Sequence, residues 1–173
     1  MRRIGFALLG ALALASVLAL ATTAIAREDD HRDKDRQGRT ILEFDTMTPV
    51  VHPFLNGEGH PIRGINGGGV PWAIQRGEGE LSANGRLEVE VRGLVIASTG
   101  VNPVAQFIAA VNCLTTTSPD TGETRLTAPV NVGPAGNARF EATLPLPRPC
   151  IAPIVFVGTP AGNSLRWFAT TGF

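Results

Sequence analysis

Three side chains of metal-binding type lie within nine residues of one another in the segment VHPFLNGEGHP. They are His52, Glu58 and His60. Two imidazoles and one carboxylate bind zinc or iron in many proteins, and the intervening glycines would let the chain fold back so that the three converge. Their spacing matches no metal motif, and both histidines precede proline in a predicted surface loop. A secreted metal-dependent enzyme that uses these three residues is kept as the alternative functional hypothesis. No cofactor is predicted.

A second chemically capable group lies in the segment RGEGELSANGRLEVEVRGL, which predicts a β-hairpin. A two-residue loop at Asn84-Gly85 would mix apolar and charged residues on each face. A three-residue loop 83–85 with a left-handed Gly85 instead makes the apolar face continuous. It pairs Leu81 with Leu87, Gly79 with Val89 and Gly77 with Val91. The two paired glycines would leave space for a large ring from the facing layer.

The same register gathers four carboxylates on the outer face of this hairpin. They are Glu78, Glu80, Glu88 and Glu90, flanked by Arg76 and Arg92. Such a ribbon could bind Ca²⁺ or a basic partner, because like charges directly opposite one another are mildly unfavourable. A solvated sheet face that keeps the protein soluble is the simpler interpretation.

The segment INGGGVPW contains three consecutive glycines, Gly67 to Gly69, which raise the question of phosphate binding. A phosphate loop needs its glycines between a strand and the start of a helix, so that backbone N–H groups converge on the anion. Here Val70-Pro71-Trp72 predicts an extended segment that enters a strand. The glycines are therefore interpreted as a loop with backbone conformations that other residues avoid, which lets Trp72 bury its ring.

The chain has two cysteines, Cys113 and Cys150, an even number typical of an oxidising compartment. One disulfide is predicted, which would stabilise the fold by roughly 4 kcal/mol through loop-closure entropy. A thiol nucleophile is the competing interpretation, but neither cysteine has an evident histidine partner in the sequence.

Several functional classes find little support in the composition. No G-x-S-x-G motif occurs, no catalytic carboxylate pair can be nominated, and the chain has no tyrosine. Trp72 and Trp167 both lie in apolar strand-like segments, which favours burial over stacking on sugars. The net charge of +0 makes nucleic acid a poor candidate partner. No catalytic residue is assigned, and an enzymatic role is left uncertain.

The first 26 residues resemble a secretory signal peptide. Two arginines precede a long apolar run that ends in Ala24-Ile25-Ala26, an A-x-A cleavage site. An uncleaved membrane anchor is the alternative, since residues 4–21 are nearly all apolar. After cleavage no stable membrane span is expected. Residues 27–40 hold five acids and five bases without an apolar side chain, and they predict a disordered charged linker.

From residue 41 onward, short apolar runs alternate with clusters of Gly, Pro, Asn and Asp, as in all-β domains. We therefore predict one domain over 41–173, an antiparallel β-sandwich of about seven to eight strands with Greek-key or Ig-like topology. The continuous apolarity of 154–157 predicts a central strand covered on both faces. Strands are expected at 41–47, 72–82, 86–97, 104–115, 123–132, 138–146, 152–158 and 165–171.

Two family resemblances follow from longer motifs. The segments GGGVPW, NPVAQFIAAVNCL, PCIAPIVFV and RWFATTGF, together with the hairpin, resemble small secreted bacterial β-domain proteins. This resemblance implies a fold and export, but no activity. Separately, GEGELSANGRLEVEVRGL is similar to the Gly-x-Gly hairpin of the chordin-like (CHRD) domain. The HIH segment that usually follows in that family is absent here, so no metal role is carried over.

Taken together, the sequence predicts a secreted, extracellular or cell-envelope protein of bacterial type that acts as a non-enzymatic binding or envelope-interaction module. Its partner is unknown and is expected to be a component of the cell envelope or another protein. A structural envelope protein that self-associates through its edges is a third hypothesis.

Overall fold

The computed structural model describes residues 38–172, so the predicted signal peptide and nearly all of the predicted linker lie outside the described residues. The described part of the chain is all-β and contains no helix, and hence no helix able to cross a membrane. Its strands are β1 Thr40–Phe44, β2 Thr48–Pro49, β3 Trp72–Ala73, β4 Arg76–Ser82, β5 Arg86–Arg92, β6 Val95–Ile96, β7 Gln106–Leu114, β8 Glu123–Leu126, β9 Val130–Asn131, β10 Ala138–Thr143, β11 Ile151–Ala161 and β12 Ser164–Thr170.

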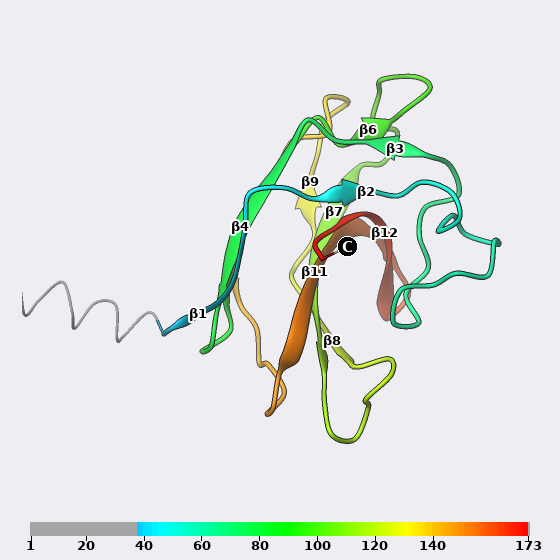
Figure 1. Cartoon of the computed structure of the whole chain (residues 1–173). Helices are drawn as coiled ribbons and strands as arrows, with labels where there is room; N and C mark the ends of the chain where they lie inside the picture. The colour runs from blue at the N-terminus through cyan, green and yellow to red at the C-terminus, as the bar shows by residue number, and fades with distance from the viewer. Residues whose placement is uncertain (1–37, 173) are drawn as a thin grey trace, which may run out of the picture. The chain divides into compact units, whose positions relative to one another are not determined.

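The strands form two large antiparallel sheets and one small one. The four-stranded sheet has the order β1-β4-β5-β10, and the larger sheet has the order β2-β12-β11-β7-β8 with β9 beside β7. Strands β3 and β6 pair separately. Figure 1 shows the sheet with β4 facing the sheet with β7 and β11, and buried residues from both belong to one hydrophobic core. This arrangement is consistent with the predicted β-sandwich.

Each of the eight predicted ranges contains a strand, but three of them are interrupted. The range 86–97 divides at Gly93, whose φ of 63° turns the chain. The N–H of Gly93 donates to Oδ1 of Asn137 (2.9 Å), and that of Leu94 donates to the carbonyl of Gly136 (3.0 Å). This turn lets β6 leave the sheet and pair with β3. The ranges 72–82 and 123–132 are likewise divided, each into two strands.

The hairpin register predicted from the sequence is confirmed. Leu81 lies opposite Leu87, Gly79 opposite Val89 and Gly77 opposite Val91. The loop 83–85 ends at Gly85 with a φ of 89°, and the Gly85 N–H donates to the carbonyl of Ser82 (2.9 Å). The buried leucines and valines therefore share one face, as the apolar pattern requires.

The space above the two hairpin glycines is filled, but not from the facing layer. A Cβ placed on Gly79 would lie 2.7 Å from Cζ of Phe44, and one on Gly77 would lie 2.7 Å from Cγ of Met47. Phe44 is the register partner of Gly79 on β1. The ring thus comes from the neighbouring strand of the same sheet, which corrects the predicted origin.

We expect Gly79→Ala to lower the free energy of unfolding by about 1–3 kcal/mol, because its methyl would collide with the backbone carbonyl of Glu88 as well as with Phe44. Gly77→Ala is the matched control, since its closest neighbours are atoms of the flexible Met47 side chain. Both changes reduce the entropy of the unfolded chain alike. Urea denaturation compares the two variants, and equal stabilities would contradict the expectation.

Aromatic rings fill the centre of the core. Trp72 stacks on Phe168 with ring centroids 3.7 Å apart and an interplanar angle of 9°, and Phe107 meets both rings edge-on. Trp167 lies between Phe54 and Phe156, at 6.4 and 6.2 Å. Trp72 and Trp167 are 3% and 1% exposed, which confirms the predicted burial of both tryptophans.

The central position predicted for 154–157 is also confirmed, because β11 lies between β12 and β7. Strand β7 is buried along both faces. One face of this sheet meets the other large sheet, and the other face meets the segment 50–71, which explains the continuous burial.

The first two strands connect the two large sheets. Strand β1 is an edge of the four-stranded sheet and β2 is an edge of the larger sheet, with only residues 45–47 between them. The chain thus crosses from one layer to the other within a short distance (Figure 1).

Candidate functional site

The outer side of the four-stranded sheet carries most of the charged side chains of the domain, and we call it the charged face. In one row, Glu43, Glu80, Glu88 and Glu141 lie directly opposite one another across all four strands. In the next row Glu78 lies opposite Glu90, and Glu90 opposite Arg139. Arg76, Arg86, Arg92 and the adjoining Asp45 complete the charged face.

Arginines neutralise the half of the charged face that is built by β5 and β10. Arg139 lies 2.7 Å from Glu141, 3.9 Å from Glu88 and 3.8 Å from Glu90. Arg86 pairs with Glu88 at 2.5 Å, and Arg92 with Glu90 at 2.6 Å. The hydrogen bond to Glu141 raises the pKa of Arg139, so this guanidinium stays charged.

The half built by β1 and β4 retains its negative charge. It surrounds a hollow of about 520 Å³, which we call the acidic hollow. Arg76 pairs with Glu78 at 2.5 Å, but no arginine among residues 38–172 lies within ion-pairing distance of Glu43, Asp45 or Glu80. Glu80 accepts a hydrogen bond from Oγ1 of Thr40 at 2.6 Å. The lining consists of Glu43, Phe44, Asp45, Glu78, Gly79, Glu80 and Glu88.

The arrangement suits the attraction of positively charged groups. Carboxylates that lie opposite one another across a sheet repel each other, and a cation placed between them relieves that repulsion. Within residues 38–172, no group of three or more His, Cys, Asp or Glu side chains is placed to hold a metal ion. The Ca²⁺ interpretation of the hairpin therefore gains no ligand set from this geometry.

The structure brings together two of the three predicted metal-ligating residues of the loop. Nδ1 of His52 lies 2.5 Å from Oε1 of Glu58, and Oε2 of Glu58 accepts the N–H of Leu55 at 3.1 Å. His60 belongs to no metal-binding group within the described residues. All three residues are exposed, as expected of a surface loop. The observed contacts of Glu58 are those of a carboxylate that holds a turn.

Two of the three consecutive glycines, Gly67 and Gly68, serve close packing and not an unusual backbone conformation, whereas a Cβ on Gly69 would meet nothing within 4 Å. None of Gly67 to Gly69 has a positive φ, which corrects the reason inferred from the sequence. A Cβ on Gly67 would collide with the carbonyl of Phe54 and lie 2.6 Å from Cγ2 of Val50. A Cβ on Gly68 would lie 3.0 Å from Nε1 of Trp72. The segment enters strand β3, as predicted, and not a helix.

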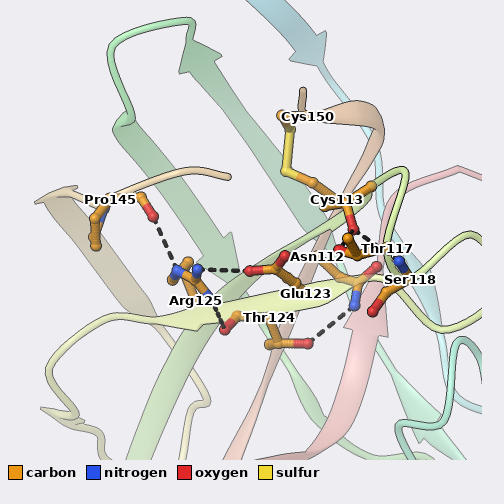
Figure 2. Close-up of polar contacts among 10 residues, drawn as sticks. Asn112, Cys113, Thr117, Ser118, Glu123, Thr124, Arg125, Pro145 and Cys150 are labelled. Carbon is orange, nitrogen blue, oxygen red and sulfur yellow. Dashed lines mark hydrogen bonds and ion pairs between the residues drawn. A yellow bond between two sulfur atoms is a disulfide. The ribbon is translucent and has the colours of Figure 1, made fainter. Parts of the chain in front are cut away.

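The predicted disulfide is present between Cys113 of β7 and Cys150, which precedes β11, with Cα atoms 4.8 Å apart. Figure 2 shows polar contacts close to it. Arg125 of β8 donates from Nε to the carbonyl of Pro145 (2.9 Å) and pairs with Glu123 at 2.8 Å. Arg125 thereby links the edge strand β8 to the segment that leads from β10 to the disulfide.

Sequence reasoning found the hairpin carboxylates but missed Glu43, Asp45, Glu141 and Arg139. Each charged residue of β10 alternates with an apolar neighbour in the segment ARFEAT, and this alternation was a usable signal. The neighbours of the hairpin in the sheet could not be read from the sequence, because they depend on long-range pairing. Comparison of the chain with protein-family models, with curated proteins and with solved structures finds no match.

Proposed function

We propose that this protein is an exported, non-enzymatic binding module, and that its acidic hollow binds basic groups of a partner protein or envelope component. The domain that presents the hollow is a β-sandwich in this proposal, held on the outer side of the cell membrane after removal of the signal peptide. The Cys113–Cys150 disulfide is compatible with such an oxidising location. The resemblance to small secreted bacterial β-domain proteins agrees with it.

The uneven charge of the sheet carries the proposal. Both halves of the charged face have several carboxylates, but only the β5–β10 half holds an arginine that reaches three of them. Glu43, Asp45 and Glu80 remain available to a basic group from outside. They are held on or beside hydrogen-bonded strands, so little conformational entropy is lost when a partner binds.

The filled interior of the domain is also consistent with a binding surface on its outside. The stacked rings of Trp72 and Phe168 and the neighbouring Phe107 occupy the centre of the domain. The protein therefore presents its polar chemistry on an outer sheet face. Electrostatic complementarity on such a face increases the association rate and the specificity of binding.

Decalysine is a suitable probe for the acidic hollow, with calorimetry at low ionic strength because salt screens exposed charges. The triple variant Glu43→Gln, Asp45→Asn, Glu80→Gln is expected to weaken decalysine binding about ten-fold, from about 0.2–1 kcal/mol for each exposed pair. The matched control is Glu90→Gln, Glu123→Gln, Glu141→Gln, which removes the same charge from carboxylates that pair with arginines and do not line the acidic hollow. It is expected to have a much smaller effect.

Equal losses in the two triple variants would show that decalysine responds only to net charge, and this result would overturn the proposed site. Absence of decalysine binding to the unaltered protein would overturn it as well. Thermal unfolding of all three proteins establishes that each variant is folded at the temperature of the titration.

A further inference from the structure

The segment 50–71, which we call the strap, pairs with the edge of β12 through a parallel bridge between Gly67 and Trp167, and it also lies over the indole of Trp167. The N–H of Gly68 donates to the carbonyl of Trp167 (2.8 Å), and the N–H of Trp167 donates to the carbonyl of Asn66 (3.1 Å). Nε1 of Trp167 donates to the carbonyl of Ile65 (3.1 Å), and Phe54 packs near the indole. The strap thus covers the apolar side chains of β11 and β12.

A tight turn places one arginine of the strap over the sheet. Ile62 and Ile65 exchange two backbone hydrogen bonds, of 3.1 and 2.9 Å. The two residues between them, Arg63 and Gly64, have φ values of 49° and 75°. Positive φ at both central residues is the geometry of a type I′ turn, in which Asn, Asp or Gly usually occupies the first position. Arginine at this position needs compensation from its surroundings.

The guanidinium of Arg63 supplies that compensation through three hydrogen bonds. Nη1 donates to the backbone carbonyl of Asn112 (3.2 Å) and to its Oδ1 (3.0 Å). Nη2 donates to the carbonyl of Ala152 (2.8 Å). Ala152 has a φ of 44°, and within residues 38–172 Arg63 and Ala152 are the two non-glycine residues with positive φ. The two unusual backbone positions are therefore hydrogen-bonded to each other.

The disulfide holds both acceptors of this arginine in place. Cys113 directly follows Asn112, and Cys150 lies two residues before Ala152. The register between β11 and β7 shifts between Ile151 and Ile154, so no regular pairing of Ala152 with β7 fixes its position. Figure 2 shows Asn112 next to the Cys113–Cys150 bond.

We propose that Arg63 and the Cys113–Cys150 disulfide form a redox-sensitive latch that keeps the strap closed over the larger sheet. A dithiol reductant opens the latch at Cys150, which is partly exposed, whereas Cys113 is fully buried. A thiolate of the dithiol attacks the sulfur of Cys150 and displaces the Cys113 thiolate. The second thiol of the reductant then releases Cys150, and two electrons and two protons pass from the dithiol to the cysteines.

Reduction acts on the strap through Ala152. Without the bond to Cys113, the segment 150–152 relaxes to a negative φ at Ala152, and the carbonyl turns away from Arg63. The arginine then loses an acceptor while its own strained turn remains. The strap loosens and uncovers Phe156 and Trp167, whereas the four-stranded sheet keeps its structure.

Hydrogen–deuterium exchange of the full chain, oxidised and treated with dithiothreitol, tests the latch. The amides of Phe54, Asn56, Ile62 and Ile65 bond within the strap. Those of Val50, Gly68 and Trp167 donate the backbone hydrogen bonds that join the strap to β12, and they report on closure. Reduction is expected to accelerate their exchange at least about ten-fold more than that of the β4–β5 hairpin amides, which follow the loss of global stability alone.

The variant Arg63→Gly removes the side-chain hydrogen bonds of Arg63 without adding backbone strain, because glycine readily adopts the positive φ. Oxidised Arg63→Gly should exchange in the strap like the reduced unaltered protein, and reduction of the variant should add little. Arg63→Lys, which keeps the charge but not the planar fork, serves if the glycine variant does not fold.

The proposal fails if reduction leaves strap exchange unchanged. It fails equally if reduction accelerates exchange in the hairpin and in the strap by the same factor, since the disulfide would then act on global stability alone. If Arg63→Gly and reduction each accelerate strap exchange, and their effects multiply when the variant is reduced, the two contributions are independent. That result would also overturn the latch.

Discussion

Trp167→Ala is expected to lower the free energy of unfolding by about 3–5 kcal/mol, one of the two largest effects that we predict. The indole is 1% exposed and lies between Phe54 and Phe156, so its removal leaves a cavity that three segments border. It also removes one of the two donors of the Ile65 carbonyl, which keeps the N–H of Ile62. Urea denaturation of the oxidised protein measures the loss.

Trp167→Phe is the control that separates the loss of packing from the loss of the hydrogen bond. It retains a ring between the neighbouring aromatic residues but removes the Nε1–H donor, and because the Ile65 carbonyl keeps the N–H of Ile62 it should cost about 0.5–1.5 kcal/mol. If the alanine variant were as stable as the phenylalanine variant, the packing of the indole would contribute little, contrary to the geometry described above.

Cys113→Ala with Cys150→Ala is the second large change, with an expected loss of roughly 4 kcal/mol from the released loop entropy. Alanine is preferred to serine because Cys113 is fully buried, and a hydroxyl there would need a hydrogen-bond partner. The free energy of unfolding of the double variant, compared with that of the oxidised protein, gives the contribution of the bond.

A second measurement establishes that the oxidised protein used in that comparison contains the disulfide. Alkylation of the unreduced protein should add no label, because the structure pairs both cysteines. Labelling of two thiols would mean that the oxidised reference was never formed. A double variant as stable as the fully oxidised protein would instead refute the stabilising role of the bond.

Local patterns in the sequence were sufficient for the hairpin and for the two buried tryptophans. The hairpin register follows from one rule, that Leu81 and Val89 must point the same way, and only the loop 83–85 satisfies it. The pairing of Cys113 with Cys150 was predictable because the chain has only two cysteines. None of these inferences required knowledge of the strand order.

Long-range pairing accounts for what the sequence could not predict. The charged face gains Glu43 from β1 and Glu141 from β10, which lie far from the hairpin in the sequence and next to it in the sheet. The interruption at Gly93 depends on Asn137, whose proximity is equally non-local. Arg63 was not singled out in the sequence, because its acceptors on Asn112 and Ala152 are distant from it in the chain.

The interpretation of Gly67 to Gly69 was right about the strand that follows and wrong about the backbone. A run of glycines suggests positive φ, but here the requirement is space for Phe54, Val50 and Trp72. Which atoms approach a glycine is a property of tertiary packing. A single sequence therefore cannot show whether such a glycine is needed for a positive φ or for the close approach of neighbouring atoms.

The crossing of the chain from β1 to β2 gives the N-terminal strands a protective role toward the rest of the domain. These strands cap β4 and β12, one in each large sheet. Proteolytic trimming past residue 49 would open the hydrogen-bonding ladder of β4 and, in β12, the positions of Ala169 and Thr170. Exposed ladders of this kind recruit strands from other molecules, so residues 40–49 protect the domain against polymerisation.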